Sequence, residues 1–457
     1  MKNRFTLCGT VLHAPVCGEI EVIESGLIEV DADGTIAGVT APEDENYAGI
    51  KQKAIETGRF VELSEGQYLL PGMIDLHVHA PQWPQAGNAL HMPLYDWLQE
   101  KTFPLEAKYA DLDFAEKSYS SLVETLIGNG TTTTLYFGTV HLEATKLLAD
   151  ICLAKGQRAL VGKVAMDNPD ECPDYYRDPS VQQGLDDTRA LIDYVRRMPG
   201  NEHDLVLPVV TPRFIPSCTD EMLTGLGELA QEYDCHVQTH CSESDWEHGY
   251  VLNRHGERDT QSLNHFKLLT NKTVLAHSCF INDDDMATIK QQDSGVAHCP
   301  ISNAYFANAV FPARKALDRG LNVGLGTDVA GGTTPSLLQN CNAAITASRY
   351  LEEGVDIKKS PAERGVPKSR IDFKEAFWMA TTGGGKALDL NIGLFNEGYA
   401  FDAIVVDTKV AESNVVIWDE LDDVEGILQK IIYNAGRQNI RKVWVQGALI
   451  GGCDLSK

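Results

Sequence analysis

Eight apolar runs rich in β-forming residues alternate with helix-length amphipathic stretches through the middle of this 457-residue chain. The runs predict strands at 69–78, 131–137, 159–166, 205–211, 236–240, 273–277, 295–298 and 321–327. Helices are predicted between them, for example at 115–128 and 186–197. Because strands that alternate with helices build parallel βα units, we predict an α/β fold with a TIM-like (β/α)8 barrel.

The two ends of the chain have a different pattern. Short alternating runs with Gly and Asp-Gly turn signals, such as 26–39, fill the N-terminal region, and similar runs return at 399–407 and 442–450. We therefore predict a small β-sandwich domain built from both chain ends, with residues 1–66 and 391–457 flanking a barrel of residues 67–390.

Four of the predicted strands end in histidine or aspartate: His77 and His79, His240, His277 and Asp328. The carboxyl ends of barrel strands meet at one face, where such barrels carry their active sites. Taken singly, each residue has an ordinary explanation, such as a chance His-x-His pair, a core histidine or a helix-capping aspartate. Their shared position at strand ends favours one common site.

Three imidazoles and a carboxylate are ligands that zinc prefers, and a catalytic zinc site keeps one position for water. We predict that His77, His79, His240 and Asp328 hold one Zn²⁺, with Fe²⁺ as the alternative metal. A metal-activated water also needs a proton carrier. We assign this role to Glu243, three residues after His240, although an exposed loop glutamate would look the same in the sequence.

His277 is predicted to orient the attacking water and to stabilise the tetrahedral centre that forms, unless it is a hydrogen-bonded core histidine. His236 and Gln238 point inward by strand alternation and are expected to fill the barrel. His298 and Cys299 end another strand and are candidates to line the cavity, with no chemical step assigned to either.

The composition limits the kinds of binding partner and the cellular compartment that we expect for this protein. The chain has 39 Lys plus Arg against 65 Asp plus Glu, and a net charge of −26 disfavours binding to nucleic-acid polymers. No apolar stretch is long enough for a membrane span, and the N-terminal region lacks the pattern of a secretory signal. The 11 cysteines include no Cys-x-x-Cys pair, which is typical of reduced thiols and a cytoplasmic protein.

These residues together resemble the amidohydrolase superfamily, which carries His-x-His on the first barrel strand and His, His and Asp on the fifth, sixth and eighth. Residues 71–79 resemble its opening motif, and 380–390 and 400–407 resemble its return to the flanking β-domain. Binuclear members place a carboxylated lysine on the fourth strand. Here the fourth strand leads into Arg213 and Lys163 falls on the third, so the resemblance implies one metal.

Within the superfamily the chain resembles the guanine deaminase family, in the motifs at 79–82, 83–87, 211–214 and 240–243. This resemblance implies that Gln82 and Arg213 hydrogen-bond a purine edge and that Phe214 packs on its face. It also implies that Asp328 takes a proton from the water, that guanine becomes xanthine and ammonia, and that the protein is a homodimer. Apart from the resemblance, Arg213 could neutralise acidic neighbours and Phe214 could be a core residue.

Two other functions stay open at this point. One is deamination or dechlorination of another heterocycle, such as a pterin, a triazine or a cytosine-like ring; the other is an inactive relative that serves as a scaffold. The aromatic insertion at 91–109 follows the first strand and is expected to form a pocket wall or a subunit contact. The polar, Pro-punctuated segment 357–370 is predicted to be an exposed loop.

Overall fold

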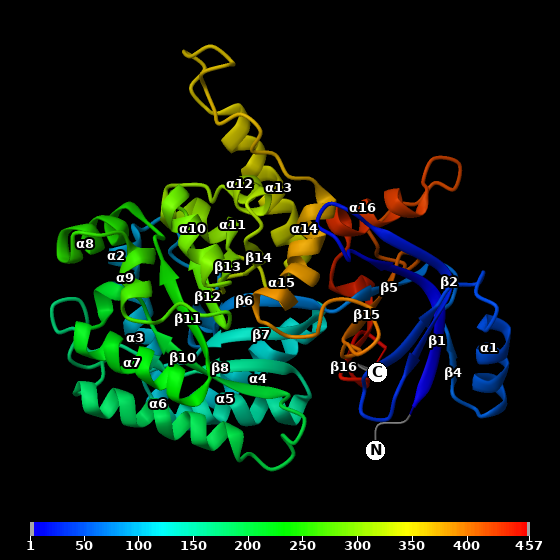
Figure 1. Cartoon of the computed structure of the whole chain (residues 1–457), viewed down its shortest axis with the longest axis horizontal. Helices are drawn as coiled ribbons and strands as arrows, with labels where there is room; N and C mark the ends of the chain where they lie inside the picture. The colour runs from blue at the N-terminus through cyan, green and yellow to red at the C-terminus, as the bar shows by residue number, and fades with distance from the viewer. Residues whose placement is uncertain (1–3, 455–457) are drawn as a thin grey trace.

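The computed structural model describes residues 4–454 (Figure 1), and its central part is a nearly closed barrel of parallel strands. The barrel strands are β6 (Met73–His79), β7 (Thr131–Phe137), β8 (Arg158–Gly162), β10 (Val206–Pro212), β11 (His236–Cys241), β12 (Thr273–His277), β13 (Gly295–His298) and β14 (Asn322–Leu325). They lie side by side in chain order, which confirms the predicted (β/α)8 architecture. Most of their residues are buried, as expected for strands covered on both faces.

Backbone hydrogen bonds join the first and last barrel strands at the edge where the predicted site residues lie. The Asp328 N–H donates to the His77 carbonyl at 2.8 Å, and the His79 N–H donates to the Val329 carbonyl at 2.9 Å. The buried Asp75 carboxylate accepts both the backbone N–H and the hydroxyl of Thr327, at 2.9 and 2.6 Å. These bonds fix Asp328 beside the histidines of β6.

Two predicted strands are each divided in the structure. The run at 69–78 is split by Gly72 into β5 (Gln67–Pro71), which joins the sheet of the chain ends, and β6 of the barrel. A Cβ at Gly72 would lie 2.1 Å from Oγ1 of Thr132, so only glycine lets the chain cross here. The run at 159–166 is interrupted at Lys163, and β9 (Val164–Ala165) then pairs with β10.

Strands from both chain ends form the second, β-sandwich-like domain. They are β1 (Phe5–His13), β2 (Glu21–Val30), β3 (Ile36–Thr40), β4 (Phe60–Glu62), β5, β15 (Ala403–Asp407), β16 (Ile440–Val445) and β17 (Ala448–Gly451), accompanied by α1 (Tyr47–Glu56) and α16 (Val424–Asn434). Their common core includes Leu7, Ile28, Phe401 and Trp444. The division at 66/67 and 390/391 stays a prediction, and the pairing of β5 favours a first boundary at Gly72.

Helices cover the outside of the barrel (Figure 1). They include α4 (Leu112–Gly128), α5 (Leu142–Lys155), α6 (Val181–Arg196), α7 (Asp220–Tyr233), α8 (Asp245–His255), α9 (Asp259–His265), α10 (Asp283–Gln291), α12 (Ala313–Asp318) and α13 (Leu337–Glu353), followed by α14 (Phe373–Ala380) and α15 (Thr382–Ala387). Helices α4 and α6 begin earlier than predicted because Asp111 and Ser180 accept the free N–H groups of their first turns. No helix of the described chain is long and apolar enough to cross a bilayer.

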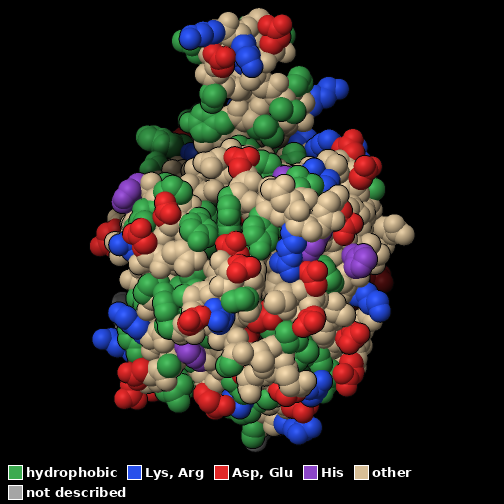
Figure 2. Space-filling model, turned by 90° about the vertical axis from the view of Figure 1, so that its left-hand side faces the viewer, with side chains coloured by type: hydrophobic (Ala, Val, Ile, Leu, Met, Phe, Trp, Pro, Cys, Tyr) green, Lys and Arg blue, Asp and Glu red, His purple; other side chains and the backbone are tan. Residues whose placement is uncertain are grey.

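Two segments leave this regular pattern. The insertion after β6 forms short turns: η1 (Ala80–Gln85), α2 (Leu94–Trp97), η2 (Leu98–Thr102), α3 (Phe103–Glu106) and η3 (Ala107–Ala110). The segment after α13 projects from the body of the molecule, as Figures 1 and 2 show. It includes 357–370, whose turns and exposed residues confirm the predicted loop.

Candidate metal centre and substrate pocket

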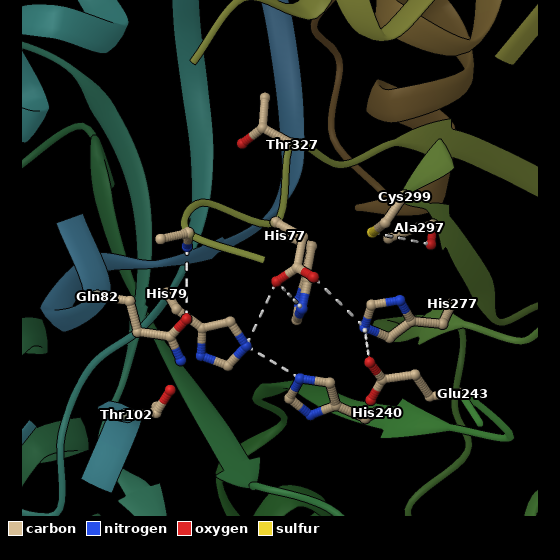
Figure 3. A network of polar contacts seen from close by, with 12 residues as sticks. His77, His79, Gln82, Thr102, His240, Glu243, His277, Ala297, Cys299 and Thr327 are labelled. Carbon is tan, nitrogen blue, oxygen red and sulfur yellow. Dashed lines mark hydrogen bonds and ion pairs between the residues drawn. The ribbon is translucent and has the colours of Figure 1, made fainter. Parts of the chain in front are cut away.

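The structure brings the four predicted metal ligands together at the carboxyl end of the barrel, and Figure 3 labels the three histidines among them. Nε2 of His77 lies 3.2 Å from Oδ1 of Asp328, and Nε2 of His79 lies 3.6 Å from the same oxygen. Nε2 of His79 is also 3.0 Å from Nε2 of His240. All four side chains are buried. Residues more than 240 positions apart in the chain therefore form a single cluster.

Strand geometry and local backbone turns aim these side chains inward. His77 and His79 are two residues apart on β6 and so share a face. His277, at the end of β12, and Asp328, after β14, have φ angles of 68° and 49°, in the left-handed region that non-glycine residues rarely adopt. Such backbone strain is concentrated at functional sites, where the surrounding structure holds it in place.

The cluster has the chemistry of a metal site. Nδ1 of His240 donates to the Arg213 carbonyl at 2.6 Å, so its Nε2 lone pair faces the centre of the cluster. Nε2 of His77 has no hydrogen-bond partner among the described residues. Burial lowers the pKa of the His77, His79 and His240 side chains well below the ordinary value, which keeps them neutral. Two overlapping groups have ligand atoms within 4.8 Å of one another: His77, His240 and His277, and His77, His79 and Asp328.

Glu243 and His277 lie beside this cluster. Oε1 of Glu243 is 3.7 Å from Nε2 of His277, and the other ring nitrogen of His277 donates to Oδ1 of Asn303 at 2.9 Å. Burial, together with the negative charge of Asp328, raises the pKa of Glu243 to about 8. A carboxyl group that titrates near neutral pH is suited to accept and release a proton.

A cavity opens directly onto these groups. Its empty space, including the part that is open to solvent, is about 370 Å³. Its lining residues are His79, Gln82, Leu94, Trp97, Leu98, Arg213, Phe214, His240, Glu243, Phe306, Asp328 and Gly331. All three predicted substrate-binding residues are therefore in its wall. Leu94, Trp97 and Leu98 come from the aromatic insertion, so this segment contributes to the pocket wall.

Glu106, which sequence reasoning missed, holds one side of the pocket. It is fully buried and receives two hydrogen bonds from the Arg213 guanidinium, at 2.7 and 3.1 Å. Gln82 Nε2 donates to the same carboxylate at 2.9 Å, and the Tyr176 hydroxyl donates to it at 2.6 Å. Arg213 thus neutralises an acidic neighbour and lines the pocket at the same time. The only sequence signal for Glu106 was a carboxylate within the aromatic insertion.

Aromatic rings complete the walls of the site. The Phe214 ring lies 5.8 Å from Trp246 and 6.0 Å from the His240 ring, between centroids. Phe137, at the end of β7, contacts the His77, His79 and His240 rings, with centroid distances of 4.8 to 4.9 Å. The site is therefore a shielded cavity in which electrostatic interactions are strong.

The remaining predicted barrel residues lie deeper. His236 Nε2 donates to the Leu388 carbonyl at 2.8 Å, and Gln238 donates to the Tyr136 carbonyl at 2.7 Å, which confirms the predicted polar filling. His298 and Cys299 are buried but are not among the residues that line the cavity. Burial raises the pKa of the Cys299 thiol well above its usual range, which disfavours a thiolate nucleophile.

Comparison with known proteins identifies the family of this chain. The model of the amidohydrolase family matches residues 68–450. A probable guanine deaminase of Schizosaccharomyces pombe is 36% identical, over 98% of this chain and 83% of the relative. The guanine deaminase of Homo sapiens is 35% identical, over 96% of this chain and 95% of the relative.

Solved structures agree with the sequence comparison. The structure of the guanine deaminase from C. acetobutylicum, with bound guanine in its active site, superposes with a TM-score of 0.86 at 32% identity and covers 98% of this chain and 100% of that one. A triazine hydrolase from Arthobacter aurescens has a TM-score of 0.80 at 18% identity, which shows a shared fold alone. The chain belongs to the amidohydrolase family and, within it, to the guanine deaminase family.

Proposed function

We propose that this protein hydrolyses guanine to xanthine and ammonia. The observation that carries the proposal is one pocket whose lining includes Arg213 and Gln82 together with Glu243, His79 and His240. The guanine-bound structure of a relative at 32% identity supports the choice of substrate. An inactive scaffold is not favoured, because the four proposed ligands and Glu243 lie together at one pocket.

The proposed metal is one Zn²⁺ per chain, held by His77, His79, His240 and Asp328, with Fe²⁺ as the alternative. Neutral imidazoles and one carboxylate are suited to both ions. When bound, such a metal lowers the pKa of water and so supplies a nucleophile at neutral pH. Nε2 of His77 has no hydrogen-bond partner among the described residues, and Nε2 of His240 faces the centre of the cluster. Both observations support this assignment.

Glu243 and Asp328 are proposed to move the protons of the reaction. Glu243 takes one proton from the attacking water and delivers it to the ring nitrogen next to the carbon that carries the exocyclic amine. Asp328 takes the second water proton and helps to transfer it to the leaving group, so that ammonia departs as the carbonyl of xanthine forms. His277, whose Nδ1 is engaged by Asn303, presents Nε2 to the water and orients it.

Arg213, Gln82 and Phe214 are proposed to bind the purine. Arg213 has five N–H donors in a fixed geometry, and two of its nitrogens each donate one hydrogen bond to Glu106. The other N–H donors remain for the carbonyl and ring-nitrogen acceptors of guanine. Gln82 donates one amide hydrogen to Glu106 and accepts the Ala330 N–H at 3.4 Å, which leaves one donor and one lone pair. Phe214 is proposed to pack on the purine face.

A panel of heterocycles tests this substrate assignment. The metallated protein is incubated separately with guanine, a pterin, a triazine and cytosine, and ammonia release gives kcat/KM for each. We expect guanine to be the preferred substrate by about 100-fold or more, since a site built for specific hydrogen bonds rejects analogues that leave its polar groups unpaired. A higher kcat/KM for another ring would assign the protein to that substrate instead.

We further propose that the protein is a cytoplasmic homodimer. The nine buried cysteines of the described chain are free thiols, as expected in a reducing compartment. The projecting segment and the end of α13 expose Tyr350, Val355 and Ile357 at 64%, 82% and 86%, an apolar surface that supports contact with a second copy.

A further inference from the structure

Two carboxyl groups behind the Glu243 loop have no part in the proposed metal binding, proton transfer or substrate binding. Glu247 lies in the first turn of α8, and Asp259 begins α9. Both side chains are fully buried, although charged residues are rarely fully buried without a partner. Within residues 4–454, neither carboxylate forms an ion pair with a lysine or arginine.

The two carboxyl groups hold consecutive backbone amides of the Glu243 loop. Oδ2 of Asp259 accepts the Ser242 N–H at 2.8 Å, and Oε2 of Glu247 accepts the Glu243 N–H at 2.6 Å. Hydrogen bonds to an ionised carboxylate are among the stronger ones in proteins. The backbone on both sides of the Ser242–Glu243 peptide is therefore fixed from behind the pocket.

These two hydrogen bonds hold a strained turn in place. Ser242 has a φ angle of 48°, in the left-handed region, immediately after β11 ends at Cys241. A non-glycine residue rarely adopts this region and persists there only when neighbouring groups hold it. The turn brings the Glu243 side chain to 3.7 Å from His277, so a relaxed Ser242 would move the proton carrier.

The second oxygen of each carboxyl group indicates that the two groups share a proton. Oε1 of Glu247 and Oδ1 of Asp259 find no N–H or O–H donor in the described part of the chain. A proton held by one carboxyl group and shared with the other would satisfy both oxygens, because a protonated carboxyl group is a hydrogen-bond donor. Burial raises the pKa of Glu247 well above its usual range, consistent with a neutral acid that donates to Asp259.

We propose that Glu247 and Asp259, by holding the Ser242 and Glu243 amides, position Glu243 for proton transfer. They are positioning residues, because neither lines the pocket and both act through the backbone of the loop. The inference rests on the proposed function, in which Glu243 carries the proton.

The test compares Glu247→Ala, Glu247→Gln and a matched control by kcat, KM and metal content. We expect Glu247→Ala to lower kcat by about 10- to 100-fold, since small misplacements of catalytic groups have effects of this size, with KM within about threefold. Glu247→Gln keeps an acceptor for the Glu243 N–H and a donor for Asp259, so it should recover most of the loss. The control Glu221→Ala removes an exposed first-turn acid from α7 and should match the wild type.

The outcomes separate this inference from the proposed function. If the wild-type protein fails to deaminate guanine, the proposed function is wrong. If the wild type is active and folded Glu247→Ala has the same kcat, or if Glu247→Gln recovers nothing, the positioning role is wrong. Should Glu247→Ala not fold, Glu247→Met takes its place, since it preserves side-chain length but offers no carboxyl acceptor.

Discussion

Replacing Glu243 with glutamine is expected to lower kcat for guanine by about 10²–10⁴-fold, the usual contribution of general acid–base catalysis. Glutamine has nearly the same shape but does not take up and release a proton at neutral pH. Because Glu243 lies beside the ligand cluster and is not one of the predicted ligands, metal content should stay at the wild-type level. Steady-state kinetics and elemental analysis of the same preparation measure both quantities.

Asp245→Asn provides a matched control for this variant. Asp245 is a nearby exposed carboxylate at the start of α8, outside the substrate cavity, and its replacement should change neither kcat nor metal content. Retention of wild-type kcat by metal-loaded Glu243→Gln would remove the proton-carrier assignment.

Replacing Arg213 with methionine is expected to have the second largest effect, on both stability and substrate binding. It leaves the Glu106 carboxylate fully buried without its cationic partner, and breaking such a pair typically costs about 3–5 kcal/mol of unfolding free energy. It also removes hydrogen-bond donors to the purine, and a hydrogen bond from a charged group contributes about 1.5–3 kcal/mol. We therefore expect KM for guanine to rise by about 10- to 100-fold.

Arg158→Met distinguishes the loss of stability from the loss of substrate binding. Arg158 forms a similar buried pair with Asp402, at 2.9 and 3.2 Å, but this pair joins the barrel to the β-domain away from the pocket. Its loss should destabilise the protein without changing KM. An Arg213→Met variant with unchanged KM, measured below its unfolding transition, would contradict the substrate-binding role.

The strand pattern and the ligand set were the most predictable features. The proposed metal ligands could be predicted because they end barrel strands, and barrel topology places all strand ends at one face. They are His77, His79, His240 and Asp328. The division at Gly72 was not predictable from local pattern, since the apolar run continues across it and only the close approach of Thr132 reveals the crossing.

The supporting groups of the site could not be predicted from the sequence. Glu106 acts through Arg213, which is 107 residues away in the chain, and nothing in its local sequence specifies that contact. Glu247 and Asp259 likewise look like ordinary helix-start acids, and their function depends on burial behind a strained turn. Tertiary packing, and not local pattern, gives these carboxyl groups their partners.

The most direct measurement is a titration of metal-free protein with Zn²⁺ while xanthine and ammonia formation from guanine are followed. We expect no turnover without metal, a rate that rises in proportion to bound zinc, and saturation at one ion per chain. Full activity in the metal-free protein, or a chain carrying one zinc ion that leaves guanine unchanged, would contradict this expectation.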